Sequence, residues 1–198
     1  MTANKDLKIG GLLLAAGGST RFGSPKQLAI YQGKPLIRRS AETLIASGCH
    51  PNVVVLGAEI EGSTNEIAGL PINICVNTDW QSGMSSSIKA GLDHLLKREP
   101  KLDAVLITLC DQPEVTTDSL GLLLSEFQRA SAALVVAKYG KTFGVPALFS
   151  ADLFDLLLKL QGDKGARNLI RSRPDLITIE MPTAAIDIDT PSDAALRQ

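Results

Sequence analysis

The stretch IGGLLLAAGGSTRFGSPKQL, residues 9–28, joins a short apolar run to a loop rich in glycine. The run over residues 9–15 has the length and composition of a buried strand, and a pair of glycines follows it closely. Glycines let backbone N–H groups curl around an anion, and the nearby cations Arg21 and Lys26 would neutralise the charge of that anion. This segment therefore predicts a strand followed by a phosphate-binding loop.

The loop matches neither of two common nucleotide-binding patterns. Gly18 and Gly23 have the spacing of the glycines in a Walker loop, but Ser24 and Pro25 stand where that loop requires Lys followed by Ser or Thr. The Gly-x-Gly-x-x-Gly pattern of dinucleotide-binding strands is also absent. The sequence therefore argues against a P-loop NTPase and against an NAD-binding domain. A surface turn with solvated charges is the alternative interpretation of the glycines.

Apolar runs and helical patterns alternate along the rest of the chain. Further strands are expected at residues 52–57, 72–76, 103–109, 133–137, 144–149 and 176–180, and helices at 36–48, 59–68, 83–96, 120–130, 150–160 and 163–172. Continuous apolar strands separated by helices are typical of a mostly parallel sheet covered on both faces. We expect the strand 144–149 to lie at an edge, because Pro146 cannot donate a backbone hydrogen bond. No linker or repeat divides residues 1–198, which predicts one three-layer, Rossmann-like α/β domain with its ligands at the carboxyl ends of the strands.

Composition narrows the classes of function. The 198 residues include 20 Lys+Arg and 21 Asp+Glu, a net charge of −1, and 44% of them are hydrophobic. One Trp, two Tyr and five Phe, without a basic excess, are unsuited to a broad nucleic-acid platform. Three widely spaced cysteines predict neither disulfides nor a zinc site. We find no signal-peptide pattern and no apolar run long enough for a membrane span, so we expect a soluble, cytoplasmic protein.

The near-neutral total conceals a separation of charge along the chain. Residues 7–41 contain six cations and no acid, whereas residues 174–193 contain five acids and no base. We expect the sheet to bring these two segments together. Cations suited to a bound anion and carboxylates suited to a metal ion would then meet at one site.

Five short motifs give the chain a resemblance to a known family. They are LAAGGSTRFGSPK at residues 14–26, NTDWQSGMSSS at 77–87, DQP at 111–113, GDKGAR at 162–167 and DIDTP at 187–191. The chain resembles nucleotidyltransferases, and more narrowly the branch related to molybdenum cofactor cytidylyltransferases. The resemblance implies Mg²⁺-dependent transfer of CMP from CTP onto a molybdopterin-type acceptor with release of pyrophosphate. It also implies a molybdoenzyme or its chaperone as a partner.

The resemblance assigns residues to three parts of the site. Nucleotide contacts fall on Leu14, Ala15, Ala16, Gly17, Gly18, Ser19, Arg21, Lys26, Asn77, Gly83, Met84, Ser85 and Asp111; acceptor contacts fall on Gln112, Gly144, Lys164 and Arg167. Asp111 and Asp189 would bind Mg²⁺, with Asp187 as the alternative second ligand, and Lys26, Arg21 and Asp111 would act in catalysis. No general base is required, because a phosphate monoester with a second pKa near 6 is largely ionised at neutral pH.

The sequence leaves several alternatives open. Val145 stands where the cofactor cytidylyltransferases carry a histidine, so the acceptor could instead be a sugar phosphate or another phosphorylated metabolite. Only the Leu-Ala-Ala-Gly loop favours CTP over GTP, and a nucleotide-binding regulator without turnover is a further alternative. Asp163 has a structural interpretation, as the N-cap of the helix expected at 163–172 with Arg167 pairing to it.

Overall fold

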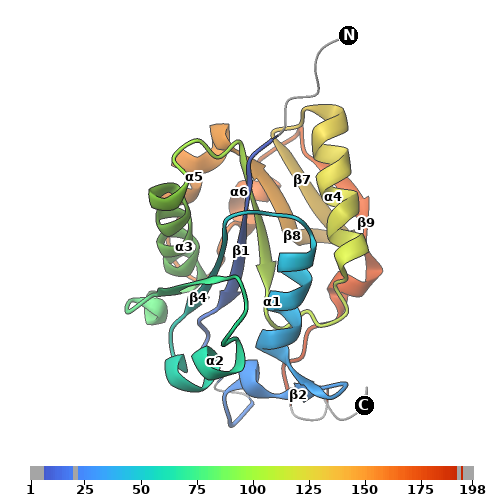
Figure 1. Cartoon of the computed structure of the whole chain (residues 1–198). Coiled ribbons are helices and arrows are strands. Elements are labelled where there is room, and N and C mark those ends of the chain that lie inside the picture. Colours follow the sequence, from blue (N-terminus) through green and yellow to red (C-terminus); the bar gives the residue numbers. More distant parts are fainter. Residues whose placement is uncertain (1–6, 20–21, 191–192, 194–198) are drawn as a thin grey trace.

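The computed structural model describes residues 7–19, 22–190 and 193, and its centre is a seven-stranded sheet (Figure 1). The strands are β1 (Ile9–Ala15), β4 (Asn52–Leu56), β5 (Asn73–Val76), β6 (Ala104–Leu109), β7 (Leu134–Tyr139), β8 (Thr142–Ser150) and β9 (Ile177–Glu180), in the spatial order β5-β4-β1-β6-β8-β7-β9. All residues of β1 and β4 are buried, and so are the first four residues of β7. Such burial is expected for strands that are covered on both faces. The predicted α/β fold with a mostly parallel sheet is confirmed.

One strand runs against the other six. Strand β8 pairs antiparallel with both β6 and β7, whereas the remaining neighbours pair in parallel. The prediction that this strand lies at an edge is therefore wrong. The physical reason is a bulge: Ala147 opposes Val136 and Gly144 opposes the next residue of β7, so Val145 and Pro146 have no partner in that ladder. A bulge accommodates a proline inside a sheet, because the missing N–H is not needed there.

Helices cover both faces of the sheet and bury two separate apolar layers. The helices are α1 (Leu36–Ala46), α2 (Ile60–Glu66), α3 (Met84–Arg98), α4 (Thr117–Ala130), α5 (Phe154–Leu158) and α6 (Arg167–Arg171). On one face α1 and α4, which lie side by side in Figure 1, pack on strand residues such as Leu13 and Leu106. On the other face α3, α5 and α6 pack on Leu12 and Ile107. Neighbouring strand residues thus serve opposite layers, as the two-residue period of a strand requires.

Two of the later helices are shorter than the sequence predicts. The segment expected as a helix over 150–160 is a 3₁₀ turn, Ala151–Leu153, followed by α5. The segment 163–172 becomes helical only at Arg167, because Gly165 has φ of 51° and interrupts a right-handed helix. Ala166 is the N-cap of α6, and no side chain caps this helix. The interpretation of Asp163 as its N-cap is therefore wrong.

The remaining elements are short. A two-stranded hairpin, β2 (Ile30–Tyr31) and β3 (Lys34–Pro35), follows the glycine-rich loop, and further 3₁₀ turns cover Lys26–Leu28, Trp80–Ser82 and Pro182–Ala185. Within the described part of the chain, no helix has the length and apolar character needed to cross a membrane.

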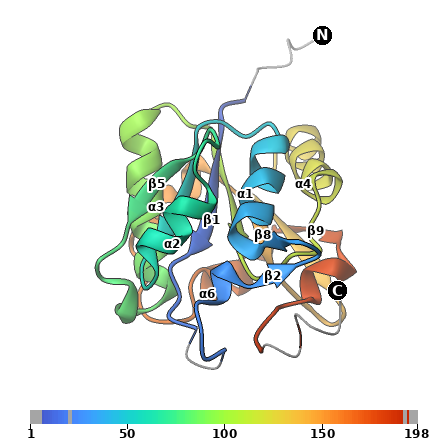
Figure 2. The ribbon, with the colours of Figure 1, turned by 60° about the horizontal axis from the view of Figure 1, so that its bottom comes forward.

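The carboxyl ends of the parallel strands gather distant parts of the chain at one end of the molecule, which Figure 2 brings toward the viewer. Backbone hydrogen bonds join the segments that follow the strands: Cys110 N donates to Leu14 O over 3.1 Å, and Ala58 N donates to Ala16 O over 3.2 Å. Ile188 N donates to Asp111 O over 2.9 Å. The segment beyond β9 is thus bound to the end of β6 by the main chain itself.

Candidate active site

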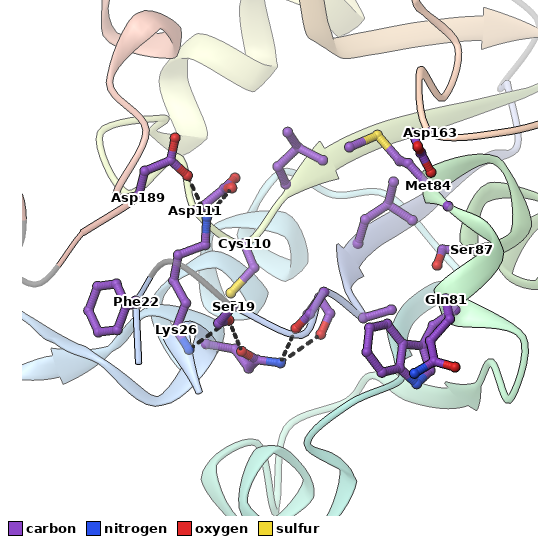
Figure 3. Close-up of a pocket in the computed structure, with 18 residues that line it drawn as sticks. Ser19, Phe22, Lys26, Gln81, Met84, Ser87, Cys110, Asp111, Asp163 and Asp189 are labelled. Carbon is purple, nitrogen blue, oxygen red and sulfur yellow. Dashed lines mark hydrogen bonds and ion pairs between the residues drawn. The ribbon is translucent and has the colours of Figure 1, made fainter. Parts of the chain in front are cut away.

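A cavity of about 440 Å³ opens at these strand ends (Figure 3). Ten of the residues predicted to bind nucleotide or metal line it: Leu14, Ala15, Ala16, Gly17, Ser19, Lys26, Gly83, Met84, Asp111 and Asp189. They come from four separate stretches of sequence, which the sheet topology places around one space. Gly18 lines a smaller neighbouring hollow of about 310 Å³, which shares Gly17, Ser19 and Gln27 with the main cavity. Arg21 lies outside the described residues.

A lysine and two carboxylates meet at one end of the cavity. Lys26 Nζ lies 2.8 Å from Asp111 Oδ2 and 3.0 Å from Asp189 Oδ1 (Figure 3). Burial lowers the pKa of Lys26, but the two carboxylates outweigh that effect and hold the pKa above its usual value. The lysine is therefore charged at neutral pH. The expected approach of the basic N-terminal segment to the acidic C-terminal segment is realised at this contact.

The carboxylates fit the oxygen-rich coordination of a divalent cation bound to phosphates. Asp111 Oδ1 is buried without a hydrogen-bond partner, although Oδ2 of the same group is paired with Lys26. Mg²⁺ in phosphate chemistry takes one or two protein carboxylates and fills its shell with phosphate oxygens and water. Among the described residues no group of three or more His, Cys, Asp or Glu side chains could hold a metal without such help.

Asp187, the alternative second ligand, has a different environment from Asp189. Partial burial, and then the negative charge of Asp111, raise the pKa of Asp187, while Gln112 opposes the shift with a hydrogen bond. Lys26 forms its ion pair with Asp189. The geometry favours Asp189 as the partner of Asp111, and its assignment to a metal stays a prediction.

The glycine-rich loop is held by a residue that sequence reasoning missed. Gln27 is buried, and its amide donates to the carbonyls of Ala15 and Gly17 over 3.3 and 3.2 Å. Ser19 Oγ bridges the loop by donating to Gln27 Oε1 and accepting from the backbone N–H of Lys26. The sequence does place Gln27 next to Lys26, a predicted phosphate ligand. A polar residue in a loop is nevertheless expected to be exposed, and only the packing shows that Gln27 is buried.

The opposite end of the cavity lies at the start of α3. Met84, Ser87, Gln81 and Asp163 lie there, well separated from Lys26 in Figure 3. Gly83 has φ of 107°, and a Cβ at this position would lie 2.3 Å from Asp163 Oδ1. The carboxylate of Asp163 therefore depends on glycine to approach the helix start this closely. The sequence motif contains Asp163, but its position in the cavity follows only from the tertiary fold.

Two predicted nucleotide contacts lie behind the cavity wall instead of on it. Asn77 is buried, and its amide donates to Ser86 Oγ and Ser87 Oγ over 2.8 and 3.0 Å. Ser85 is also buried, and its backbone N–H donates to Gly162 O over 3.2 Å. Asn77 thus supports Ser87, which does line the cavity, and Ser85 joins the start of α3 to the segment at Gly162. Their predicted contact with a nucleotide stays a prediction.

The four predicted acceptor residues lie outside the lining of this cavity. Lys164 and Arg167 are exposed, whereas the buried amide of Gln112 donates to Ala184 O over 2.8 Å and to Val145 O over 3.4 Å. Gly144 lies beside Tyr139, whose hydroxyl would be 2.8 Å from a Cβ on that glycine.

Tyr139, which was not predicted, connects this group. Partial burial and the charge of Asp187 raise the pKa of the Tyr139 hydroxyl, and Arg167 opposes the shift. Gly144 thus lies against the hydroxyl of Tyr139, at the end of β7, and the charges of Arg167 and Asp187 act on the same hydroxyl. The predicted role of this region in acceptor binding stays a prediction.

Comparison with known proteins identifies the family. Residues 11–177 match the model of the MobA-like NTP transferase domain. The chain is similar to nicotine blue oxidoreductase of Paenarthrobacter nicotinovorans, with 35% identity over 192 residues that cover 92% of each chain. It is 29% identical over 174 residues to the purine catabolism protein PucB of Bacillus subtilis, covering 82% of this chain and 80% of that protein. A probable molybdenum cofactor guanylyltransferase of Bacillus cereus is 27% identical over 128 residues, which cover 65% of this chain and 61% of the relative.

Solved structures share the fold of this chain. The crystal structure of Rv0371c from Mycobacterium tuberculosis H37Rv superposes with a TM-score of 0.82 and 25% identity, over 96% of this chain and 97% of that one. A second structure of Rv0371c is a complex with manganese and superposes with a TM-score of 0.77. The family model covers residues 11–177, which include β1, the glycine-rich loop and Lys26. The chain therefore belongs to the MobA-like NTP transferase family, a family of nucleotidyltransferases.

Proposed function

We propose that this protein transfers CMP from CTP, with Mg²⁺, onto the phosphate of a molybdopterin-type acceptor and releases pyrophosphate. The observation that carries the proposal is the meeting of Lys26 with Asp111 and Asp189 at one end of a cavity of about 440 Å³. A cation and two carboxylates at one point are the groups that triphosphate chemistry needs. The opposite end, near Gly83 and Asp163, would then take the nucleoside.

The chemistry requires alignment more than proton transfer. An oxygen of the acceptor's phosphate would form a bond to the α-phosphorus, the bond from that phosphorus to the bridging oxygen would break, and the electron pair would leave with pyrophosphate. A bound Mg²⁺, held by Asp111 and Asp189, would neutralise charge on the phosphates. Lys26 would hold the triphosphate, and the loop around Gly17 would offer backbone N–H groups to it. We expect Arg21 to add a second cation.

Burial makes the cavity's own thiol a poor nucleophile. Cys110 lines the cavity, but burial, followed by the charge of Asp111, raises the pKa of its thiol. The thiol is therefore protonated at neutral pH. This supports direct attack by the acceptor phosphate over a covalent cysteine intermediate.

The test is release of pyrophosphate. We would incubate the protein with each of the four nucleoside triphosphates, Mg²⁺ and molybdopterin-type cofactor, and measure pyrophosphate. We expect release with CTP. Lys26→Ala should reduce kcat/KM by about a hundredfold, because the positive charge that would hold the triphosphate is removed. Release with GTP alone would overturn the cytidine assignment, and undiminished turnover of the variant would overturn the role of Lys26.

A different acceptor is a second candidate within the same chemistry. Val145 lies in the bulge of β8, and its backbone carbonyl accepts a hydrogen bond from buried Gln112. Its side chain is apolar, whereas the molybdenum cofactor cytidylyltransferases carry a histidine at the corresponding position. Pyrophosphate release with a sugar phosphate, and none with molybdopterin, would favour this candidate. CTP binding without release with any acceptor would indicate a regulator.

A third candidate comes from the relative with 35% identity, which is named an oxidoreductase. Its name assigns redox chemistry to a chain that this one matches over 92% of its length. The discriminating measurement is protein-dependent reduction of nicotine blue, the compound in the relative's name, followed by the dye's visible absorbance with a chemical reductant supplied as electron donor. Turnover in that assay without pyrophosphate release would replace the transferase proposal.

A further inference from the structure

Lys26 occupies the place that the proposed function gives to a divalent cation. Its ammonium lies within 3.0 Å of an oxygen from Asp111 and from Asp189. Among the described residues that line the cavity, Lys26 is the only cation. One lysine ammonium thus contacts both carboxylates, and these three groups taken by themselves carry a formal net charge of −1.

This ion pair differs from one that serves stability alone. The side chains of Lys26, Asp111 and Asp189 are 20%, 25% and 52% exposed, and pairs in contact with water contribute little to folding. Asp111 Oδ1 is moreover buried without a hydrogen-bond partner. A buried carboxylate oxygen without a partner is costly, and a bound cation at this position would satisfy it.

The same lysine cannot serve the carboxylates and a triphosphate equally. A triphosphate close to Asp111 and Asp189 would meet two negative charges unless a second cation neutralised them. If Lys26 turns toward the phosphates, the carboxylates change from a charge of −1 with the lysine to −2 without it. That change favours a divalent cation at the moment when the nucleotide arrives.

We infer that Lys26 is a built-in occupant of the carboxylate site, which the nucleotide draws away so that a divalent cation can enter. The inference rests on the proposed function and adds a binding order to it. The free protein binds divalent cations weakly, and nucleotide and cation bind together with positive coupling. The lysine thus keeps the site from filling with metal in the absence of substrate.

The experiment measures Mn²⁺ binding to the protein without nucleotide, from the electron paramagnetic resonance signal of unbound Mn²⁺. Lys26→Met removes the charge and keeps an unbranched side chain. We expect it to bind Mn²⁺ about tenfold more tightly than the wild type, within the usual range of coupling between two sites. Lys34→Met is the matched control, because Lys34 pairs with Glu42 on the surface at 2.6 Å, and its Mn²⁺ affinity should equal that of the wild type.

A second substitution ties the gain to the carboxylates. In the Lys26→Met background, Asp189→Asn should return the Mn²⁺ affinity to the wild-type level or below. Thermal unfolding of every variant shows whether it is folded. If Lys26→Met does not fold, Lys26→Gln takes its place. A Lys26 variant that is folded and binds Mn²⁺ no more tightly than the wild type would overturn the inference.

The inference and the proposed function fail separately. Pyrophosphate release from CTP by the wild type tests the transferase, whereas Mn²⁺ binding by the free protein tests the exchange. Tight Mn²⁺ binding by the wild type together with pyrophosphate release would leave the transferase standing and reject the exchange. Absence of pyrophosphate release, with tighter Mn²⁺ binding by Lys26→Met, would keep the lysine as occupant of the cation site and reject the transferase.

Discussion

Asp163 places a carboxylate at the end of the cavity away from Lys26. An ionised carboxylate only accepts hydrogen bonds, so it favours a ligand that presents N–H or O–H groups. With the triphosphate at Lys26, as proposed, the base extends toward this carboxylate. Cytosine carries an amino group where uracil carries a carbonyl oxygen, and a carbonyl facing Asp163 would bring two acceptors together.

We therefore predict that Asp163→Asn weakens discrimination between CTP and UTP. An amide can donate as well as accept, so the ratio of kcat/KM for CTP to that for UTP should fall about tenfold, which corresponds to roughly one hydrogen bond. The measurement is pyrophosphate release with each nucleotide. Asp155→Asn, on the exposed surface of α5, is the control and should keep the wild-type ratio. An unchanged ratio in Asp163→Asn would separate this carboxylate from base recognition.

At the scale of single residues, sequence motifs locate charged ligands better than they locate the residues that hold them. Lys26, Asp111 and Asp189 were each predicted from a motif, and the structure brings them within one contact. Gln27 and Tyr139 were not predicted. Their positions depend on which side chains the folded chain packs around them, and a local pattern carries no information about that.

The start of α3 is an element whose geometry depends on one glycine. Gly83 has φ of 107°, and an added Cβ would also meet the backbone of Gly162 at 2.7 Å. Gly121, in the middle of α4, has open space around the position of a Cβ. The two positions therefore give opposite predictions for the same substitution.

Gly83→Ala should destabilise the protein by about 1–2 kcal/mol, because an L-residue is strained in this conformation and the neighbouring backbone must move. Gly121→Ala should stabilise it by about 0.5–1 kcal/mol, because alanine favours a helix interior. The free energy of unfolding in urea measures both. Equal effects of the two substitutions would contradict the positional explanation.

At the scale of elements, the order of strands and helices was predictable and the place of β8 was not. Periodicity and glycine signals located the elements, and bounds shifted by only a few residues in most cases. Pro146 indicated an edge strand because, in a regular central strand, every residue must donate a backbone hydrogen bond and proline cannot. The bulge at Val145 and Pro146 removes the need for that N–H, and a bulge is defined by the partner strand, which a single segment does not reveal.

Across the whole molecule, the three cysteines are free and buried. Burial raises the pKa of the Cys49, Cys75 and Cys110 thiols. The thiolate is the reactive form, and its fraction falls tenfold for each unit by which the pKa rises. Each thiol is thus protected both by packing and by remaining protonated.

We predict that iodoacetamide at pH 8 labels the native protein at least about a hundredfold more slowly than the unfolded protein. The free energy of unfolding should also fall as the pH rises above about 8.5, because the unfolded thiols lose protons there while the native thiols keep theirs. Mass spectrometry of the native protein and of protein in guanidinium measures the labelling rates. Urea titrations at pH 7 and pH 9 measure the change in the free energy of unfolding. Stoichiometric labelling of native protein within minutes would contradict the prediction.

The contact between Lys26 and the two carboxylates joins residues 85 and 163 positions apart in the chain. Contacts across such long intervals form late, because the entropy of closing each loop must first be offset. Asp189 is held in place by the segment beyond β9, in which the neighbouring Ile188 N–H donates to Asp111 O at the end of β6. During refolding, nucleotide affinity should therefore return with the last kinetic phase. Nucleotide binding would then report when the native state is complete.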